Sequence, residues 1–217
     1  MRLLIKKELK LSTSPLAWWF LLFSLMTFIP GYPILMGAFF ICFGLFQSVQ
    51  SAREADDIIY SALLPIRKKD VVTAKYLVAV FFQMLGFLLI VLFAVIRMTA
   101  LWETPVYAEN PLLAANLTYL GGVLLIYAAF NGIFLGGFFK TAYYYGKPFI
   151  FYIIATVLVV GIFETVWHFP NLHFLGESNP QALLLQVPVL LVAVVIYVGM
   201  TFASLKKAQK SFVKIDL

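Results

Sequence analysis

Few residues in this sequence have side chains suited to acid–base or metal chemistry, and the group that combines a carboxylate with both histidines is Glu164, His168 and His173. Glu164 and His168 are four residues apart, so a helix would place them on one face. One carboxylate and two imidazoles could serve a metal site or a membrane-embedded hydrolase. A zinc site also needs supporting hydrogen-bond partners, however, and the His-Glu-x-x-His motif is missing. We therefore interpret both histidines as interfacial rings and keep the hydrolase as an alternative.

Two charged residues, Arg97 and Glu164, lie within otherwise apolar stretches. Charges inside a membrane are costly, and they usually pair with each other or mark a pathway. Both residues are expected in the outer third of their helices, where they could form an ion pair at an outer gate. Alternatively, each side chain extends to the lipid headgroups from within about two turns of its helix end.

The sequence contains no motif for binding ATP. Gly146-Lys147 is followed by Pro148, and no glycine lies five residues before Gly146, so a Walker A loop is absent. We therefore expect this chain to bind no cofactor. Any ATP and Mg²⁺ that power it must be bound by a partner subunit.

The only long polar interval lies between residues 47 and 75. Its first part, residues 53–64, predicts a helix with acids on one face and apolar residues on another, and Pro65 ends this helix. Such a helix on the inner face suits docking against a cytoplasmic partner, whereas a solvated loop is the alternative. The predicted docking residues are Arg53, Glu54, Asp56, Asp57, Ile58, Tyr60, Ser61 and Leu64.

The sequence as a whole is strongly apolar. Of its 217 residues, 63% are hydrophobic and 12% are charged, whereas soluble domains have about 25% charged residues. This composition predicts one polytopic membrane domain over residues 1–217. The net charge of +6 would suggest nucleic acid in a soluble protein. Here the basic residues flank apolar spans. They keep those helix ends on the cytoplasmic side and attract anionic lipid, so we expect no nucleic-acid partner.

The basic residues are distributed so as to fix the orientation of the chain. Fifteen of the sixteen Lys and Arg residues fall into four clusters separated by long apolar stretches. The clusters are Arg2/Lys6/Lys7/Lys10, Arg53/Arg67/Lys68/Lys69/Lys75, Lys140/Lys147 and Lys206/Lys207/Lys210/Lys214. Because Lys and Arg near helix ends stay on the cytoplasmic side, we predict that both termini are cytoplasmic in a multi-pass protein of the plasma membrane.

The apolar stretches predict six membrane spans, at residues 16–29, 34–46, 76–101, 112–139, 148–169 and 183–205. The first two are shorter than the ~20 residues that a spanning helix needs. They could be short spans or a re-entrant hairpin, and Trp18 and Trp19 at an interface position favour two spans. Residues 1–11 alternate apolar and basic side chains, which predicts an amphipathic helix on the inner leaflet.

Gly132 and Gly136 have the G-x-x-x-G spacing within the predicted fourth span. This spacing predicts close packing between helices, and a moving interface between two copies of the chain is the further possibility. Asn131, beside them, is expected to hydrogen-bond across helices in either case.

Taken together, the order of these features resembles the permease subunits of ABC-2 type exporters. The resemblance covers essentially the whole chain: an amphipathic start, six spans, a polar inner helix ending in Leu64-Pro65, the Lys75-Tyr76-Leu77 entry to the third span, and a basic tail. The small six-span permeases whose ATPase is a separate polypeptide, including the phenol-soluble modulin exporters, are similar in size. The resemblance implies that residues 53–64 are the coupling helix, seated in a groove of an ATP-binding subunit.

The resemblance also implies an all-α permease with no enzymatic activity of its own. It would act with a second permease copy, identical or related, and export a substrate such as an amphipathic peptide. A peptide-binding immunity or sensor protein of the membrane is the remaining alternative.

Overall fold

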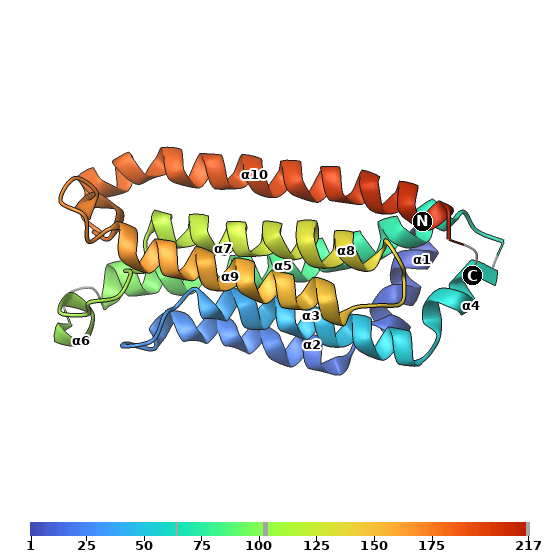
Figure 1. Ribbon diagram of the computed structural model, residues 1–217. Coiled ribbons are helices and arrows are strands. Elements are labelled where there is room, and N and C mark those ends of the chain that lie inside the picture. The colour runs from blue at the N-terminus through green and yellow to red at the C-terminus, as the bar shows by residue number, and fades with distance from the viewer. Residues whose placement is uncertain (64, 102–103, 216–217) are drawn as a thin grey trace.

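The computed structural model describes residues 1–63, 65–101 and 104–215. All regular elements in this part of the chain are helical, so the predicted all-α fold is confirmed (Figure 1). The helices are α1 (Arg2–Lys7), α2 (Pro15–Phe20), α3 (Met36–Glu54), α4 (Asp57–Leu63), α5 (Lys68–Ala100), α6 (Pro105–Ala108), α7 (Leu117–Ala129), α8 (Gly136–Phe138), α9 (Gly146–Val166) and α10 (Pro180–Val213). The segments of other helix types are η1 (Glu8–Ser12, π), η2 (Leu21–Phe28, 3₁₀), η3 (Phe130–Leu135, π) and η4 (His173–Leu175, 3₁₀).

Polar residues that precede apolar stretches set where two of the helices begin. Ser14 caps α2 by accepting a hydrogen bond from the Leu16 N–H at 3.3 Å, and Pro15 takes the first helical position. Asn116 caps α7 in the same way, with 3.0 Å between its Oδ1 and the Tyr119 nitrogen. The predicted fourth span therefore begins at residue 117 rather than 112, because Asn116 ends the preceding loop.

The long helices lie side by side along one axis, and the chain ends gather at one end of the bundle (Figure 1). α1 and η1 lie across that end, bent by 89° from α2 and η2. Both termini and α4 are at the same end, whereas α6 and η4 lie at the opposite end. The predicted cytoplasmic and outer connections thus occupy opposite ends of the molecule.

The predicted count of six spans is not confirmed. Four of the described helices can cross a membrane by length and composition: α5, α9, α10 and the continuous segment Leu117–Phe138, which runs from α7 through η3 to α8 and is here named the α7–α8 helix. A fifth span exists if the bent pair from Arg2 to Phe28 is one broken span. α2 and η2 have 6 and 8 residues. At 1.5 and 2.0 Å per residue they reach about 25 Å, short of the roughly 30 Å of hydrocarbon. α3 has 19 residues, but its last two turns are polar.

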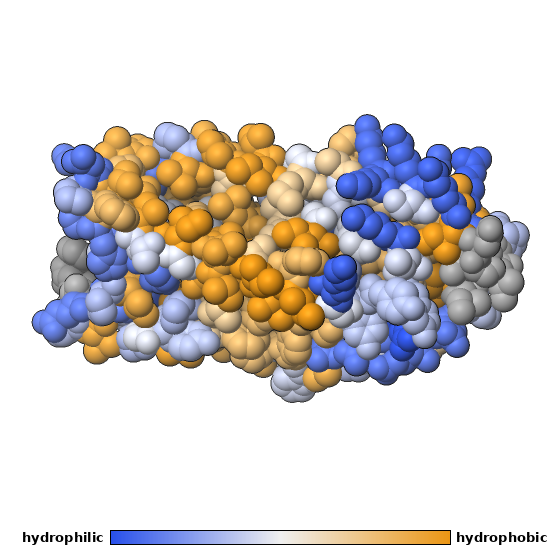
Figure 2. Space-filling model, viewed as in Figure 1, coloured by the Kyte–Doolittle hydropathy of each residue, from blue (hydrophilic) through white to orange (hydrophobic). Residues whose placement is uncertain are grey.

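α7 forms the centre of the bundle, and α9 and α10 form its outside. In the most apolar stretch of the α7–α8 helix 78% of residues are buried, against 11% for α9 and 17% for α10. Apolar side chains consequently cover the middle of the surface, and hydrophilic ones gather at both ends (Figure 2). This is the distribution of a multi-pass membrane protein.

Candidate functional site

The polar segment between α3 and α5 does not form one continuous helix. α3 extends to Glu54, and α4 begins at Asp57. Between them Asp56 adopts a left-handed backbone conformation with φ of 49°, which a helix cannot accommodate. The prediction of a single helix over residues 53–64 is therefore wrong: Arg53 and Glu54 belong to α3, and Leu64 lies outside the described residues.

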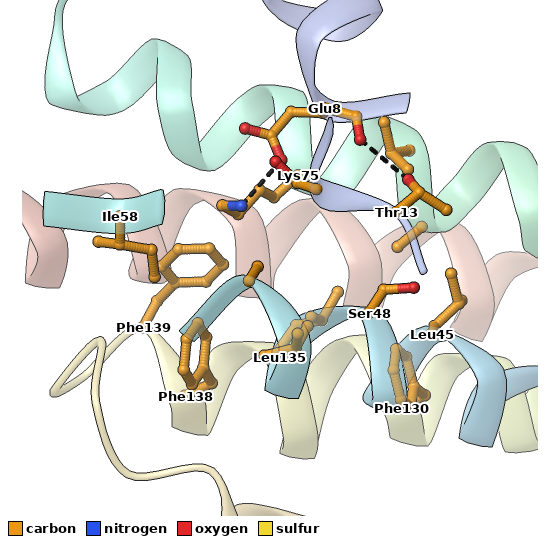
Figure 3. A pocket seen from close by; sticks show the side chains of 15 residues that line it. Glu8, Thr13, Leu45, Ser48, Ile58, Lys75, Phe130, Leu135, Phe138 and Phe139 are labelled. Carbon is orange, nitrogen blue, oxygen red and sulfur yellow. Dashed lines mark hydrogen bonds and ion pairs between the residues drawn. The ribbon is translucent and has the colours of Figure 1, made fainter. Parts of the chain in front are cut away.

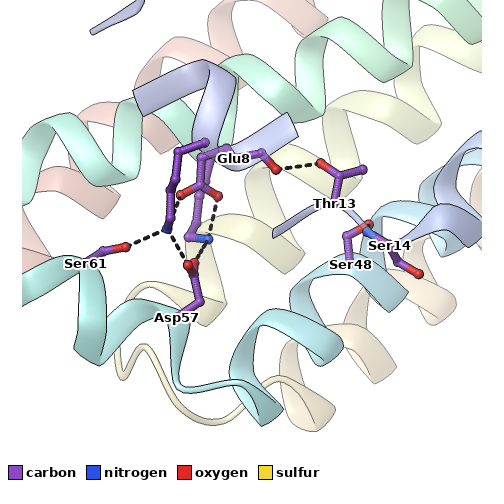
Figure 4. Close-up of polar contacts among 8 residues, drawn as sticks. Glu8, Thr13, Ser14, Ser48, Asp57 and Ser61 are labelled. Atoms are coloured by element: carbon purple, nitrogen blue, oxygen red, sulfur yellow. Dashed lines mark hydrogen bonds and ion pairs between the residues drawn. The ribbon is translucent and has the colours of Figure 1, made fainter. Parts of the chain in front are cut away.

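Four charged side chains meet where α4 faces the α1–η1 segment: Lys7, Glu8, Asp57 and Lys75, here named the four-charge cluster (Figure 4). The Lys75 ammonium donates to Glu8 and to Asp57 at 2.8 Å each, and the Lys7 ammonium donates to Glu8 at 3.1 Å and also to Asp57. Lys7 further donates to the Ser61 hydroxyl at 2.7 Å. The cluster therefore joins α4 to the α1–η1 segment and to α5.

The pKa values of Asp57 and Lys7 show that the ion pairs stabilise the charged forms by more than burial destabilises them. Burial by itself would raise the pKa of Asp57, but the charges of Lys75 and Lys7 bring it below its ordinary value of 3.8. Burial by itself would lower the pKa of Lys7, yet its bonds to Asp57 and Glu8 leave the pKa above 10.5. Both groups are thus charged at neutral pH.

The cluster changes the roles of several predicted docking residues. The hydroxyl of Ser61 and the side chain of Ile58 are buried, and Asp57 is bound to two lysines. These three side chains point into the protein and hold α4 in place. The predicted docking residues left exposed are Glu54, Asp56 and Tyr60, of which Tyr60 is 62% exposed.

Arg53 also faces the protein. Its guanidinium carbon lies 4.2 Å from the ring centroid of Tyr143 and 5.8 Å from that of Tyr145, in the connection between α8 and α9. Cations are attracted to aromatic faces at these distances. Arg53 thus ties the end of α3 to the next connection at the same end of the bundle.

A small cavity of about 40 Å³ lies between α4 and the long helices (Figure 3). Ile58 covers it from α4, Phe138 and Phe139 line it from the α7–α8 helix, and Glu8 and Lys75 supply polar atoms. A cavity of this volume holds one or a few waters. α4 is therefore seated on an apolar surface with the four-charge cluster at its edge.

Arg97 and Glu164 are not brought together by the fold. Arg97 Nη1 donates to the carbonyl of Thr27 at 2.7 Å, and its guanidinium lies 4.4 Å from the ring centroid of Tyr107. Glu164 Oε2 instead accepts from the Leu113 N–H at 2.9 Å. Within residues 1–63, 65–101 and 104–215 no ion pair joins them. Arg97 is only 4% exposed, so extension to the headgroups does not describe it either.

The structure does not assemble Glu164, His168 and His173 into a metal site. Of the residues it describes, no three His, Cys, Asp or Glu side chains lie close enough to hold a metal ion. His168 stacks on Trp167 with 4.0 Å between ring centroids, and His173 begins the η4 turn.

Gly132 and Gly136 both lie against α10 of the same chain. A Cβ atom added to Gly132 would be 2.3 Å from the Met200 Cε, and one added to Gly136 would be 2.6 Å from the Ser204 Oγ. The close approach that these glycines permit is therefore made within one chain.

A buried hydrogen-bond network lies beside these glycines. Asn131 and Gln83 exchange two hydrogen bonds of 2.9 Å, and Asn131 also donates to Thr201 at 2.9 Å. Tyr197 donates to Gln83 at 2.9 Å. The network joins α5, η3 and α10 in the apolar middle of the bundle. The prediction that Asn131 hydrogen-bonds across helices is thus confirmed, whereas its partner Gln83, the lone Gln within the third predicted span, was not singled out.

Of the four cluster residues, the sequence pointed only to Asp57, and as a docking residue; Lys7 and Lys75 served only to indicate orientation. The signal for them is Glu8, the one acid inside the first basic cluster. An acid at that position indicates a local ion pair rather than lipid attraction.

Comparison with known proteins gives one match. A family model described as "ABC-2 family transporter protein" matches residues 3–209, which include the bundle, α4 and the four-charge cluster. No curated protein and no solved structure matches the chain.

Proposed function

This chain belongs to the ABC-2 family of transporter proteins, and we propose that it is the permease subunit of an ATP-driven exporter whose ATP-binding subunit is a separate polypeptide. ATP and Mg²⁺ would be bound by that subunit. The chain would supply the membrane path and perform no covalent chemistry.

The observation that carries this proposal is the placement of α4. It lies outside the long helices, at the basic end of the bundle, with its own Tyr60 exposed and with Glu54 and Asp56 exposed just before it. Its inner face is tied to α5 through Asp57 and Lys75. A force applied to α4 by a docked subunit would therefore reach a long apolar helix directly.

The proposed orientation places the basic end and both termini in the cytoplasm, in the plasma membrane. Six crossings would be formed by α2 with η2, α3, α5, the α7–α8 helix, α9 and α10. The bias of Lys and Arg toward one end supports this orientation. α1 and η1, which lie across that end, would rest in the inner leaflet.

Two permease copies, identical or related, would form the path along their shared interface. Closure of the ATPase dimer would move both α4 helices and shift the permease between inward- and outward-open states. We propose amphipathic peptides as the substrate class, on the resemblance to the phenol-soluble modulin exporters.

Co-purification tests the proposal. The tagged full-length chain is isolated from its membrane in mild detergent, and ATP-binding protein that accompanies it is detected by ATPase activity and labelling with azido-ATP. We expect Tyr60→Ala to weaken the association by roughly 30-fold, because an exposed aromatic that enters a partner groove typically contributes about 2 kcal/mol. Glu54→Gln with Asp56→Asn tests the acids, since Asn tolerates the left-handed backbone at position 56.

Matched controls come from the opposite end of the bundle. Val106, which is 58% exposed, and Glu109, which is also exposed, give Val106→Ala and Glu109→Gln. If the variants at Glu54, Asp56 and Tyr60 retain the ATP-binding subunit as well as these controls do, the docking surface lies elsewhere. If no ATP-binding protein accompanies the unmodified chain, the assignment as an exporter permease fails.

A further inference from the structure

A cleft of about 880 Å³ opens at the basic end of the bundle, distant in sequence from α4. It lies between the η3–α8 helix, the first turn of α9 and the later turns of α10. Its volume is in the range of about 300–1,000 Å³ that small-molecule sites occupy.

The two parts of the cleft differ in chemistry. Its floor is apolar, with Phe151 and Met200 beside the small residues of η3 and α8. Its rim carries three exposed lysines, Lys140, Lys147 and Lys207. No lining residue that the structure describes is acidic. The rim thus concentrates positive charge above an apolar surface.

The lysines of the rim are available to a ligand. Over residues 1–63, 65–101 and 104–215 each ion pair is made by Lys7 or Lys75, so none uses a rim lysine. Thr141 and Tyr144 add hydroxyl groups to the rim. Ammonium and hydroxyl groups of this kind donate hydrogen bonds to phosphate oxygens.

The position of the cleft points to lipid as the source of that phosphate. α9 and α10, which form two of its walls, are the outermost long helices, with 11% and 17% of their most apolar stretches buried. Apolar side chains near the cleft are exposed, among them Phe151 at 52% and Phe202 at 56%. In a membrane crossed by α9 and α10, the floor would be continuous with the surface that faces the hydrocarbon, and the lysines near the helix ends would lie at headgroup level.

We propose that this cleft binds an anionic phospholipid of the inner leaflet. Its phosphate would lie among Lys140, Lys147 and Lys207, and its acyl chains would run along Phe151 and Met200. Basic pockets between helices at the cytoplasmic side suit such headgroups. A zwitterionic lipid would bring an additional cation to the rim and bind less well. This site requires the membrane setting but no ATP-binding partner.

Native mass spectrometry of the purified chain tests the proposal. The protein is released from nanodiscs that contain phosphatidylglycerol and phosphatidylcholine with the same acyl chains, and retained lipids are counted. We expect one retained phosphatidylglycerol, preferred over phosphatidylcholine. Each lysine near an anionic group contributes about fivefold, so Lys140→Gln, Lys147→Gln and Lys207→Gln together lower the affinity on the order of 100-fold.

Two matched controls separate the cleft from general attraction to lipid. Lys6→Gln, Lys10→Gln and Lys69→Gln remove the same charge from exposed residues elsewhere at the basic end and are expected to retain the lipid. Gly146→Trp is expected to fill the cleft, because a Cβ on Gly146 has no atom within 4 Å. Gly161→Trp, equally open and on the same helix, leaves the cleft free.

Several outcomes would overturn the proposal. Equal loss of lipid in the two triple variants would mean attraction to a charged surface only. Retention of lipid by Gly146→Trp would place the lipid elsewhere. Full competition by inorganic phosphate would assign the cleft to a soluble anion. A second copy of the chain that replaces the lipid in the spectrum would make the cleft an interface between copies.

Discussion

Replacing Asp57 by Asn tests whether the four-charge cluster holds α4 in place. The substitution keeps the size of the side chain and removes its charge. Asp57 accepts hydrogen bonds from the ammonium groups of Lys75 and Lys7, and its side chain is 12% exposed. After the change, both lysines share Glu8 as their one remaining anion in the cluster, and the formal charge of the cluster rises from zero to +1.

The expected cost follows from these contacts. Two charge-assisted hydrogen bonds are lost, each worth about 1.5–3 kcal/mol. Because Glu8 still accepts from both lysines, we expect about 3 kcal/mol in total, the lower end for breaking a buried pair. This loss should favour local opening of α4 over unfolding of the bundle, since α4 is a short segment outside the long helices and the cluster ties it to them.

Hydrogen-exchange mass spectrometry measures this opening. At 1.36 kcal/mol per factor of ten, the amides of α4 should exchange on the order of 100-fold faster in Asp57→Asn. The amides of α7, which is central and mostly buried, serve as an internal control and should not change.

A double-mutant cycle with Lys75→Gln decides whether charge is the cause. The double variant keeps the Lys7–Glu8 pair and returns the cluster to zero charge. We expect its α4 to be more protected than the sum of the single variants predicts, by at least about 1 kcal/mol. Additive effects, or unchanged exchange in Asp57→Asn, would show that α4 is held by apolar packing and that the ion pairs contribute nothing.

Three further predictions concern pH and packing. Folding lowers the pKa of Asp57 from 3.8, so its stabilisation of α4 is complete above pH 3.8 and is lost as the pH falls through the pKa of the folded state. Folding raises the pKa of Lys7 above 10.5, so its stabilisation is complete below pH 10.5 and is lost as the pH rises through the pKa of the folded state. Protection of α4, corrected for intrinsic exchange, should therefore be flat from about pH 5 to 9. Gly136→Ala should lower the unfolding free energy by about 1–3 kcal/mol, because the new Cβ would lie 2.6 Å from the Ser204 hydroxyl, which is already hydrogen-bonded. Gly132→Ala should lower it by less than about 1 kcal/mol, because the new Cβ meets the flexible methyl group of Met200. Thermal unfolding in detergent compares the two variants. Arg97→Gln should lower the unfolding free energy by about 1–3 kcal/mol, since it replaces the charged donor to a carbonyl of η2 with a shorter, neutral amide, and the same assay measures it.

The sequence predicted the helical class, the family and the approximate positions of the long helices, because apolar length and basic clusters carry that information locally. A capping Ser14 followed by Pro15 at the first helical position is a local signal of the same kind, and it stands at the start of α2. The start of α7 was missed because Asn116 was assigned to an apolar span, although Asn is also a strong capping residue.

The interior of the candidate site could not be predicted in the same way. Whether Asp57 faces a partner or the protein depends on Lys7 and Lys75, which come from distant segments that the fold brings together. The left-handed backbone at Asp56 likewise has no periodic signature. Arg97 and Glu164 were considered as a pair because each is a lone charge, but each binds a nearer backbone group instead, Arg97 through Nη1 and Glu164 through Oε2.

The continuity of α5 has a mechanical consequence. This helix runs unbroken from Lys68 to Ala100, with Lys75 bonded to α4 near its start and Arg97 bonded to η2 near its end. A straight helix resists compression, so a push at its first turns can only tilt or slide it as a rod. With about 33 Å between the two residues, a tilt of about 5° about the first would carry the second sideways by about 3 Å. That distance is about the length of one hydrogen bond, enough to exchange the carbonyl partner of Arg97 on the opposite side of the membrane.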